Sequence, residues 1–198
     1  FKQGSIIIHE LAEKPNFKKG TFVAGEIDFD RRLQLAQHHI GIYILNGSAK
    51  VVLGKHVWQA GAAKFLDKAR LDITHFDPIT AEELKKIEEL ANEVIAKDLP
   101  VYKSFMPRGV AESKYGFTIY QGGAVPGMNL RIVEIPEFDV EACGGTHLNL
   151  TGECEKLKIL KSTKVQDGVI RLEFACGKAV EKHESVDSNI LAEVAKLF

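Results

Sequence analysis

The sequence has few cysteines, almost no excess of charge and no long apolar run, and each shortage argues against a class of protein. Its three cysteines, Cys143, Cys154 and Cys176, are odd in number and irregularly spaced, which argues against a disulfide scaffold and indicates a reducing, cytoplasmic setting. The chain has twenty-six basic and twenty-seven acidic residues. It therefore lacks the excess of basic residues that is usual in proteins that bind nucleic acid through phosphate contacts alone. The run Ile6-Ile7-Ile8 is too short to span a membrane, and we expect no membrane partner.

What is present is the composition of a folded domain. Hydrophobic residues make up 45% of the chain and charged residues 27%, as is usual for globular proteins. A length of 198 residues is enough to bury a substantial core. The chain opens with Phe1 rather than methionine, from which we expect a piece of a longer protein.

Two helices are the clearest elements of the sequence. Asp28 or Asp30 can cap a helix over residues 31–53 that stops at Gly54, although two internal glycines lower its helix propensity. A second helix over residues 80–97 has a capping box and one apolar stripe. Helical spacing returns after residue 185.

Short alternating runs predict antiparallel strands between and around these helices. The runs cover residues 5–10, 21–29, 117–120, 130–133, 157–160 and 169–174, and the last two form a hairpin across 166–168. We therefore predict an α+β fold with antiparallel sheets, a long central helix and a second capped helix around a cleft.

The segment Cys143-Gly144-Gly145-Thr146-His147 carries the most specific chemistry. A cysteine and a histidine four residues apart can reach one metal ion, and glycines let the backbone turn tightly between them. Taken alone the pattern is weak, since a buried cysteine in a glycine turn beside a solvated histidine has the same sequence. Further ligands must come from His38 or His39, of which we expect only one to face inward, because adjacent helical residues point about 100° apart.

Several segments in matching order resemble the editing domain of alanyl-tRNA synthetases, over essentially the whole chain. Cys143 to His147 resembles the C-G-G-T-H motif of that family. The similar segments are Val51-Val52-Leu53-Gly54-Lys55-His56-Val57-Trp58-Gln59-Ala60-Gly61, Ala69-Arg70-Leu71-Asp72-Ile73-Thr74-His75-Phe76, and the archaeal-type Gln121-Gly122-Gly123-Ala124-Val125-Pro126-Gly127.

The resemblance implies hydrolysis of tRNA(Ala) mischarged with serine or glycine, at a pocket containing zinc. Its zinc ligands become His39, Cys143 and His147, with Tyr43 where the family has a second histidine. A phenol has a pKa of about 10, so Tyr43 is a poor ligand, and three ligands still suffice for an open catalytic site.

Further roles follow from the same resemblance. The substrate-binding positions are Ile40, where the family has threonine, together with Gly144 and Thr146. Gln59 is the pocket glutamine that orients water or the amino acid.

Other candidates rest on residue type. Asp72 can support the chemistry as a partner of His75, and Arg31 and Arg32 can meet tRNA phosphates. Trp58 and Phe105 could stack on a terminal base of the tRNA, but we expect both to lie in the core.

The predicted organisation is an editing domain over residues 1–184, truncated at its N-terminal side, and the helical start of a connection over residues 185–198. The partners implied are the tRNA(Ala) acceptor end, the rest of the synthetase in cis, and a C-terminal region through which the enzyme can oligomerise. Two alternatives remain: a freestanding trans-editing hydrolase, and a non-catalytic tRNA-binding module whose metal site has decayed, as the tyrosine and isoleucine positions suggest.

Overall fold

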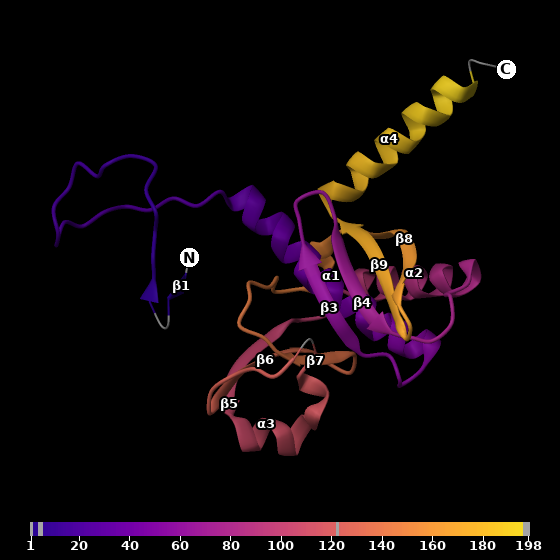
Figure 1. Ribbon diagram of the computed structural model, residues 1–198, viewed down its shortest axis with the longest axis horizontal. Coiled ribbons are helices and arrows are strands. Elements are labelled where there is room, and N and C mark those ends of the chain that lie inside the picture. Colours follow the sequence, from indigo (N-terminus) through magenta and orange to yellow (C-terminus); the bar gives the residue numbers. More distant parts are fainter. Residues whose placement is uncertain (1, 4–5, 122, 196–198) are drawn as a thin grey trace.

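The computed structural model describes residues 2–3, 6–121 and 123–195, and these confirm the predicted α+β class (Figure 1). The long helix α1 (Phe29–Leu53) packs against both α2 (Ala81–Ala96) and an antiparallel four-stranded sheet. A smaller antiparallel sheet has three strands and its own apolar cluster. The main core lies between α1, α2 and the larger sheet.

Helix α1 begins and ends where the sequence predicts. The Asp28 carboxylate caps it by accepting a hydrogen bond from the backbone N–H of Arg31 at 2.9 Å, and Gly54 ends it with φ +119°. The internal Gly41 has a packing reason, since a Cβ there would lie 2.5 Å from Cys176 Sγ and 2.8 Å from the Phe174 ring. The glycines that lower helix propensity therefore let α1 approach its neighbours closely.

The larger sheet has the order β3-β4-β9-β8, all antiparallel. Its strands are β3 (Gln59–Lys64), β4 (Ala69–Thr74), β8 (Leu157–Gln166) and β9 (Val169–Cys176). The predicted hairpin is confirmed as β8 and β9, and Gly168 in its turn has φ +74°. The capping box of α2 is also confirmed, with Thr80 and Glu83 bonding each other reciprocally.

The smaller sheet contains the main errors of the sequence interpretation. It is built from β5 (Tyr102–Pro107), β6 (Asn129–Ile135) and β7 (Asp139–Ala142), with α3 (Arg108–Tyr115) inserted after β5. The strand predicted over residues 117–120 is wrong, because Phe117–Ile119 forms a single 3-10 turn, η1, packed on this sheet. The core placement of Phe105 is also wrong, since its side chain is 75% exposed. A second 3-10 turn, η2 (Thr151–Cys154), precedes β8.

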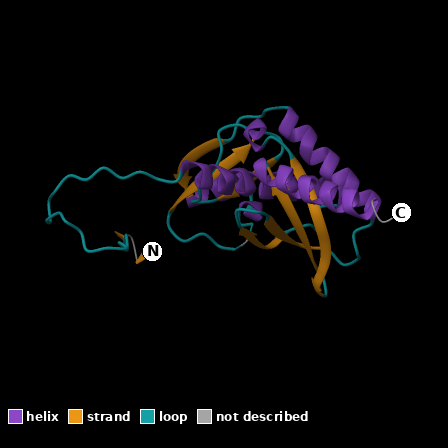
Figure 2. Ribbon diagram, turned by 90° about the horizontal axis from the view of Figure 1, so that it is seen from above, coloured by secondary structure: helices purple, strands orange, loops and turns teal. Residues whose placement is uncertain are grey.

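The two ends of the chain extend from this body (Figure 2). The strand predicted over residues 21–29 is wrong: the alternating run pairs with no strand, and α1 begins within it. Of the strand predicted over residues 5–10, residues 6–10 are described, and only β2 (Ile6–Ile7) is a strand, paired with β1 (Lys2–Gln3). Helix α4 (Lys178–Ala195) begins before residue 185, so the proposed domain boundary falls within a helix. No described helix combines the length and apolarity that crossing a membrane requires.

Candidate metal and substrate site

Helix α1 carries two adjacent histidines with different surroundings. His39 Nδ1 lies 3.1 Å from the carbonyl oxygen of Thr146. Because a carbonyl oxygen can only accept a hydrogen bond, Nδ1 carries the proton, and the lone pair of Nε2 is available to bind a metal ion. His38 is completely buried and donates from Nδ1 to the Phe65 carbonyl oxygen at 2.8 Å. Only one of the pair is fully buried, as expected, but it is His38, whereas the half-buried His39 is the one that meets the other candidate ligands.

The loop after β7 brings the second group of candidate ligands to His39. An added Cβ on Gly145 would lie 2.3 Å from His39 Cε1, so only glycine allows this approach. The backbone N–H of Gly145 donates to Cys143 Sγ at 3.4 Å. Arg131 holds the loop in shape by donating from one nitrogen to the carbonyl oxygens of Cys143 at 2.8 Å and Gly145 at 2.9 Å.

Three side chains from these elements converge as a cluster of possible metal ligands: His39, Cys143 and His147. Their ligand atoms all lie within 4.8 Å of one another. Cys143 Sγ is 3.6 Å from His39 Nε2. A tetrahedral zinc ion bonded at about 2.0–2.3 Å would separate nitrogen and sulfur ligands by about 3.5 Å, so the donor set fits a metal ion.

Tyr43 adds a hydroxyl to this cluster. Its oxygen lies 3.1 Å from His147 Nε2 and 3.4 Å from His39 Nε2. Burial raises the pKa of Tyr43 far above its usual value, and the nearby Glu141 and Cys143 add to the effect. The phenol therefore stays neutral and acts as a hydrogen-bonding neighbour of the two imidazoles.

The histidines of the cluster are tuned to stay neutral. Burial first, and then the positive charge of Lys64, lower the pKa of His39 to about 4. Burial lowers the pKa of His147 to about 3, with help from His39 and Arg131. Neutral imidazole is the form that binds metals, so neither histidine has to lose a proton near neutral pH.

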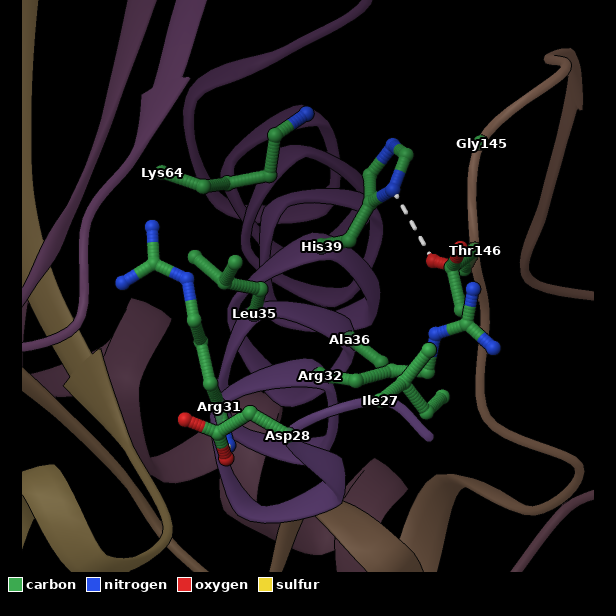
Figure 3. A pocket seen from close by; sticks show the side chains of 10 residues that line it. All are labelled: Ile27, Asp28, Arg31, Arg32, Leu35, Ala36, His39, Lys64, Gly145 and Thr146. Carbon is green, nitrogen blue, oxygen red and sulfur yellow. Dashed lines mark hydrogen bonds between the residues drawn. The ribbon is translucent and has the colours of Figure 1, made fainter. Parts of the chain in front are cut away.

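Two cavities flank the cluster. The larger cavity, of about 560 Å³, lies along the first turns of α1 and is lined by Arg31, Arg32 and the Lys64 side chain (Figure 3). The smaller cavity, of about 380 Å³, lies on the other side and includes Tyr43 and Cys143 in its wall. Three residues line both cavities: His39, Lys64 and Gly145.

Polar side chains dominate the inner end of the smaller cavity. The side-chain oxygen of Gln59 is buried and accepts no hydrogen bond from any residue that the structure describes. Gln121 fixes this region by accepting a hydrogen bond from the Gln59 backbone N–H at 2.9 Å. Glu141 is 3% exposed, and burial together with the neighbouring Asp139 raises its pKa well above the usual range.

Comparisons with known proteins agree with this arrangement. The family described as the threonyl and alanyl tRNA synthetase second additional domain matches residues 130–173, which include Cys143 and His147. The chain is 49% identical to an alanine–tRNA ligase of Methanococcus maripaludis over 176 residues, 89% of this chain and 20% of that ligase. It corresponds to the second additional domain region of archaeal alanine–tRNA ligases.

Other ligases match over the full length of this chain. Identity over 197 residues is 47% with the alanine–tRNA ligase of Pyrococcus abyssi and 46% with that of Thermococcus kodakarensis, covering 100% of the chain and 22% of each ligase. The chain thus spans about a fifth of the length of these ligases. The similarity also includes α1, which lies outside the matched family segment and supplies His39 and Tyr43.

The residues expected from the ligase resemblance are distributed unevenly around the cluster. Thr146 lines the larger cavity, and Gln59 lines the smaller one. Ile40 is fully buried, and Gly144 is exposed with no atom within 4 Å of a Cβ added to it. Neither of these two residues lines either cavity. Trp58 is half-buried.

Asp72 and His75 have other partners than each other. The Asp72 carboxylate accepts two hydrogen bonds from Arg171, at 2.7 and 2.9 Å. His75 Nδ1 lies 2.8 Å from His56 Nε2. The catalytic role of Asp72 stays a prediction.

Sequence reasoning missed four residues that the fold adds to the site: Lys64, Gln121, Arg131 and Glu141. Three come from β3, β6 and β7, and Gln121 follows η1. The spacing of these residues along the chain does not predict that they lie close together, because their proximity depends on how the two sheets are placed around α1.

Proposed function

We propose that this chain hydrolyses the ester bond of tRNA(Ala) mischarged with serine or glycine, at a zinc site held by His39, Cys143 and His147. The observation that carries the proposal is the position of this cluster between a basic cavity and a polar one. The two cavities match the two parts of an aminoacyl-tRNA ester, which has an anionic nucleotide on one side of the ester bond and a small amino acid on the other.

The larger cavity suits the acceptor end of the tRNA. Arg31 and Arg32 line it with positive charge. Its one acidic residue, Asp28, is engaged as the cap of α1. Phosphate groups of the terminal nucleotides are the partners that such side chains bind, although the chain as a whole has no basic excess.

The smaller cavity suits a serine side chain. The unpaired oxygen of Gln59 can accept a hydrogen bond from the serine hydroxyl, which alanine lacks. A buried polar group that is left without a partner costs about 1–3 kcal/mol, so the site disfavours the correctly charged alanine. Glycine lacks the hydroxyl as alanine does, so this hydrogen bond favours serine over both.

The residues of the chain position the reacting groups. When bound, zinc would supply a Lewis acid beside the ester. Thr146 fixes the His39 ring, Arg131 fixes the loop of Cys143, and Gln59 orients the attacking water or the amino acid. Water adds to the carbonyl carbon, and the ribose oxygen leaves with a proton, so the products are the free amino acid and tRNA.

Zinc content and deacylation of seryl-tRNA(Ala) by the purified chain test this proposal together. We expect one zinc ion per chain and hydrolysis above background, both lost in Cys143→Ala. Cys154→Ala is the matched control, because that thiol lies in the core, outside the cluster, where it donates to the Gln37 carbonyl oxygen. Unchanged zinc stoichiometry in Cys143→Ala would show that the site is wrongly placed.

Two alternatives predict different results in the same experiment. A non-catalytic tRNA-binding module, which the neutral Tyr43 favours, would bind tRNA without zinc and without hydrolysis. A freestanding hydrolase would act at full rate with no further domain, whereas an editing domain of a ligase gains from the rest of the enzyme in cis.

The wider organisation belongs to the same proposal. It places the chain in the cytoplasm, in keeping with its three free cysteines. Residues 1–184 would form the editing domain and residues 185–198 the start of a connection toward a region that oligomerises.

A further inference from the structure

Lys64 lies where the two cavities meet. It is the last residue of β3 and projects on the same side of the strand as Ala62, which lines the smaller cavity. In Figure 3 its side chain extends toward the His39 ring, with the nitrogen at the tip. Within the described part of the chain, this ammonium group forms no ion pair or hydrogen bond. By contrast, Lys68, which directly precedes β4, forms an ion pair with Glu173 at 2.9 Å.

The meeting point of the cavities has a chemical meaning under the proposed function, on which this inference rests. An ester joins the ribose to the amino acid, so a substrate that fills both cavities has its carbonyl group at the residues common to both. Of these three, His39 belongs to the metal cluster, and Gly145 has no side chain and directs its N–H to Cys143 Sγ. Lys64 is the remaining one, with an uncommitted donor.

We propose that Lys64 is a catalytic residue that donates a hydrogen bond to the carbonyl oxygen of the scissile ester and stabilises the negative charge that develops there. When water adds to the carbonyl carbon, the π electrons move to this oxygen, and the ammonium group holds the resulting oxyanion. Collapse of the tetrahedral intermediate restores the carbonyl and expels the ribose oxygen, which takes up the proton lost by the water. Lys64 keeps its own protons throughout.

The surroundings of Lys64 fit this role. Its charge contributes to lowering the pKa of both His39 and His147, so it lies within electrostatic range of the cluster. A cation that is already in place needs no reorganisation when charge develops on the substrate. Removal of one donor of this kind reduces the rate constant of the chemical step by about 10²–10³-fold in other hydrolases.

Single-turnover deacylation of seryl-tRNA(Ala) by the zinc-loaded chain tests the proposal. Lys64→Met should reduce the rate constant by about 10²-fold or more, while zinc content and thermal unfolding stay at the wild-type level. Lys64→Arg keeps a charged donor and should recover part of the rate. The matched control is Lys68→Met, on the same hairpin but paired on the sheet surface, which should react as fast as the wild type.

Binding of two stable analogues gives a readout that does not depend on turnover. An aminoacyl amide of the 3′-terminal adenosine imitates the substrate, and a phosphonate imitates the tetrahedral intermediate. Lys64→Met should weaken the phosphonate by about the same factor as the rate and the amide by much less. Equal weakening of both, or weaker tRNA binding with an unchanged rate, would overturn the proposal in favour of a phosphate contact.

Failure of the proposed function looks different from failure of this inference. If the wild-type chain itself does not deacylate seryl-tRNA(Ala), the proposed function is wrong and the role of Lys64 falls with it. If the wild type is active and Lys64→Met equals it, only the role of Lys64 is wrong.

Discussion

Replacing Gly145 with alanine tests how the cluster of candidate metal ligands is assembled, because the new methyl group would collide with the His39 ring. The added Cβ would lie 2.3 Å from Cε1 and 2.9 Å from Nδ1 of His39. Carbon atoms in contact stay about 3.5 Å apart, so the ring must move by about 1 Å. Metal–ligand distances tolerate only about 0.2 Å, and His39 would therefore leave the cluster.

The size of the effect follows from the number of ligands. Zinc bound by four protein ligands contributes about 10–16 kcal/mol, so one ligand accounts for about 3 kcal/mol, or about 10²-fold in the dissociation constant. The free energy of unfolding of the metal-free chain should fall by about 1–3 kcal/mol, from overpacking and from the lost hydrogen bond between His39 and Thr146.

A competition titration against a chromophoric zinc chelator measures this change directly. The control is Gly144→Ala, because no atom lies within 4 Å of a Cβ at that position and it should keep wild-type zinc affinity. Wild-type affinity in Gly145→Ala, or equal losses in both variants, would refute the reasoning.

Two further predictions concern stability. Unfolding of the metal-free chain should become easier as the pH falls from about 6.5 toward 4, because the unfolded state protonates His39 at about pH 6.5 and the folded state only at about 4. His147, whose pKa is lowered to about 3, adds to this dependence. The free energy of unfolding from urea titrations should therefore lose part of its slope against pH in His39→Gln, and an unchanged slope would contradict the assignment. Gly41→Ala should destabilise the fold by about 1–3 kcal/mol although alanine has the better helix propensity, because Cys176 and Phe174 occupy the space that the new methyl group needs. The control is Gly109→Ala in α3, where the methyl group meets no atom within 4 Å. A similar loss of stability in that variant would count against the packing argument.

The parts of the fold with local chemical signals were predictable from the sequence. Asp28 and Gly54 mark the limits of α1, and Thr80 with Glu83 marks the start of α2, since each signal acts within a few residues. The run over residues 21–29 has the alternation of a strand but pairs with none, and strand formation requires a partner. Sequence alternation alone therefore could not decide it.

The site was predictable only in part. The spacing of Cys143 and His147 indicated two candidate ligands. Burial alone would have selected the wrong helix histidine to join them, because His38 is more buried than His39 and takes no part in the cluster. The resemblance to a family pointed to His39, which the structure brings together with Cys143 and His147. Lys64 and Arg131 depend on sheet placement, which no local pattern encodes.

Helix α1 joins the outer and inner parts of the site as one rod of 25 residues. Its first turns, with Arg31 and Arg32, are exposed, whereas most of its residues from Ala36 to Ala49 are buried, and it carries His39 one turn after Ala36. No hinge residue separates the two parts within this stretch, since the first internal glycine is Gly41. The residues that line the larger cavity and the imidazole of the candidate ligand cluster are therefore held by one continuous helix, so a change in the position of α1 would affect both together.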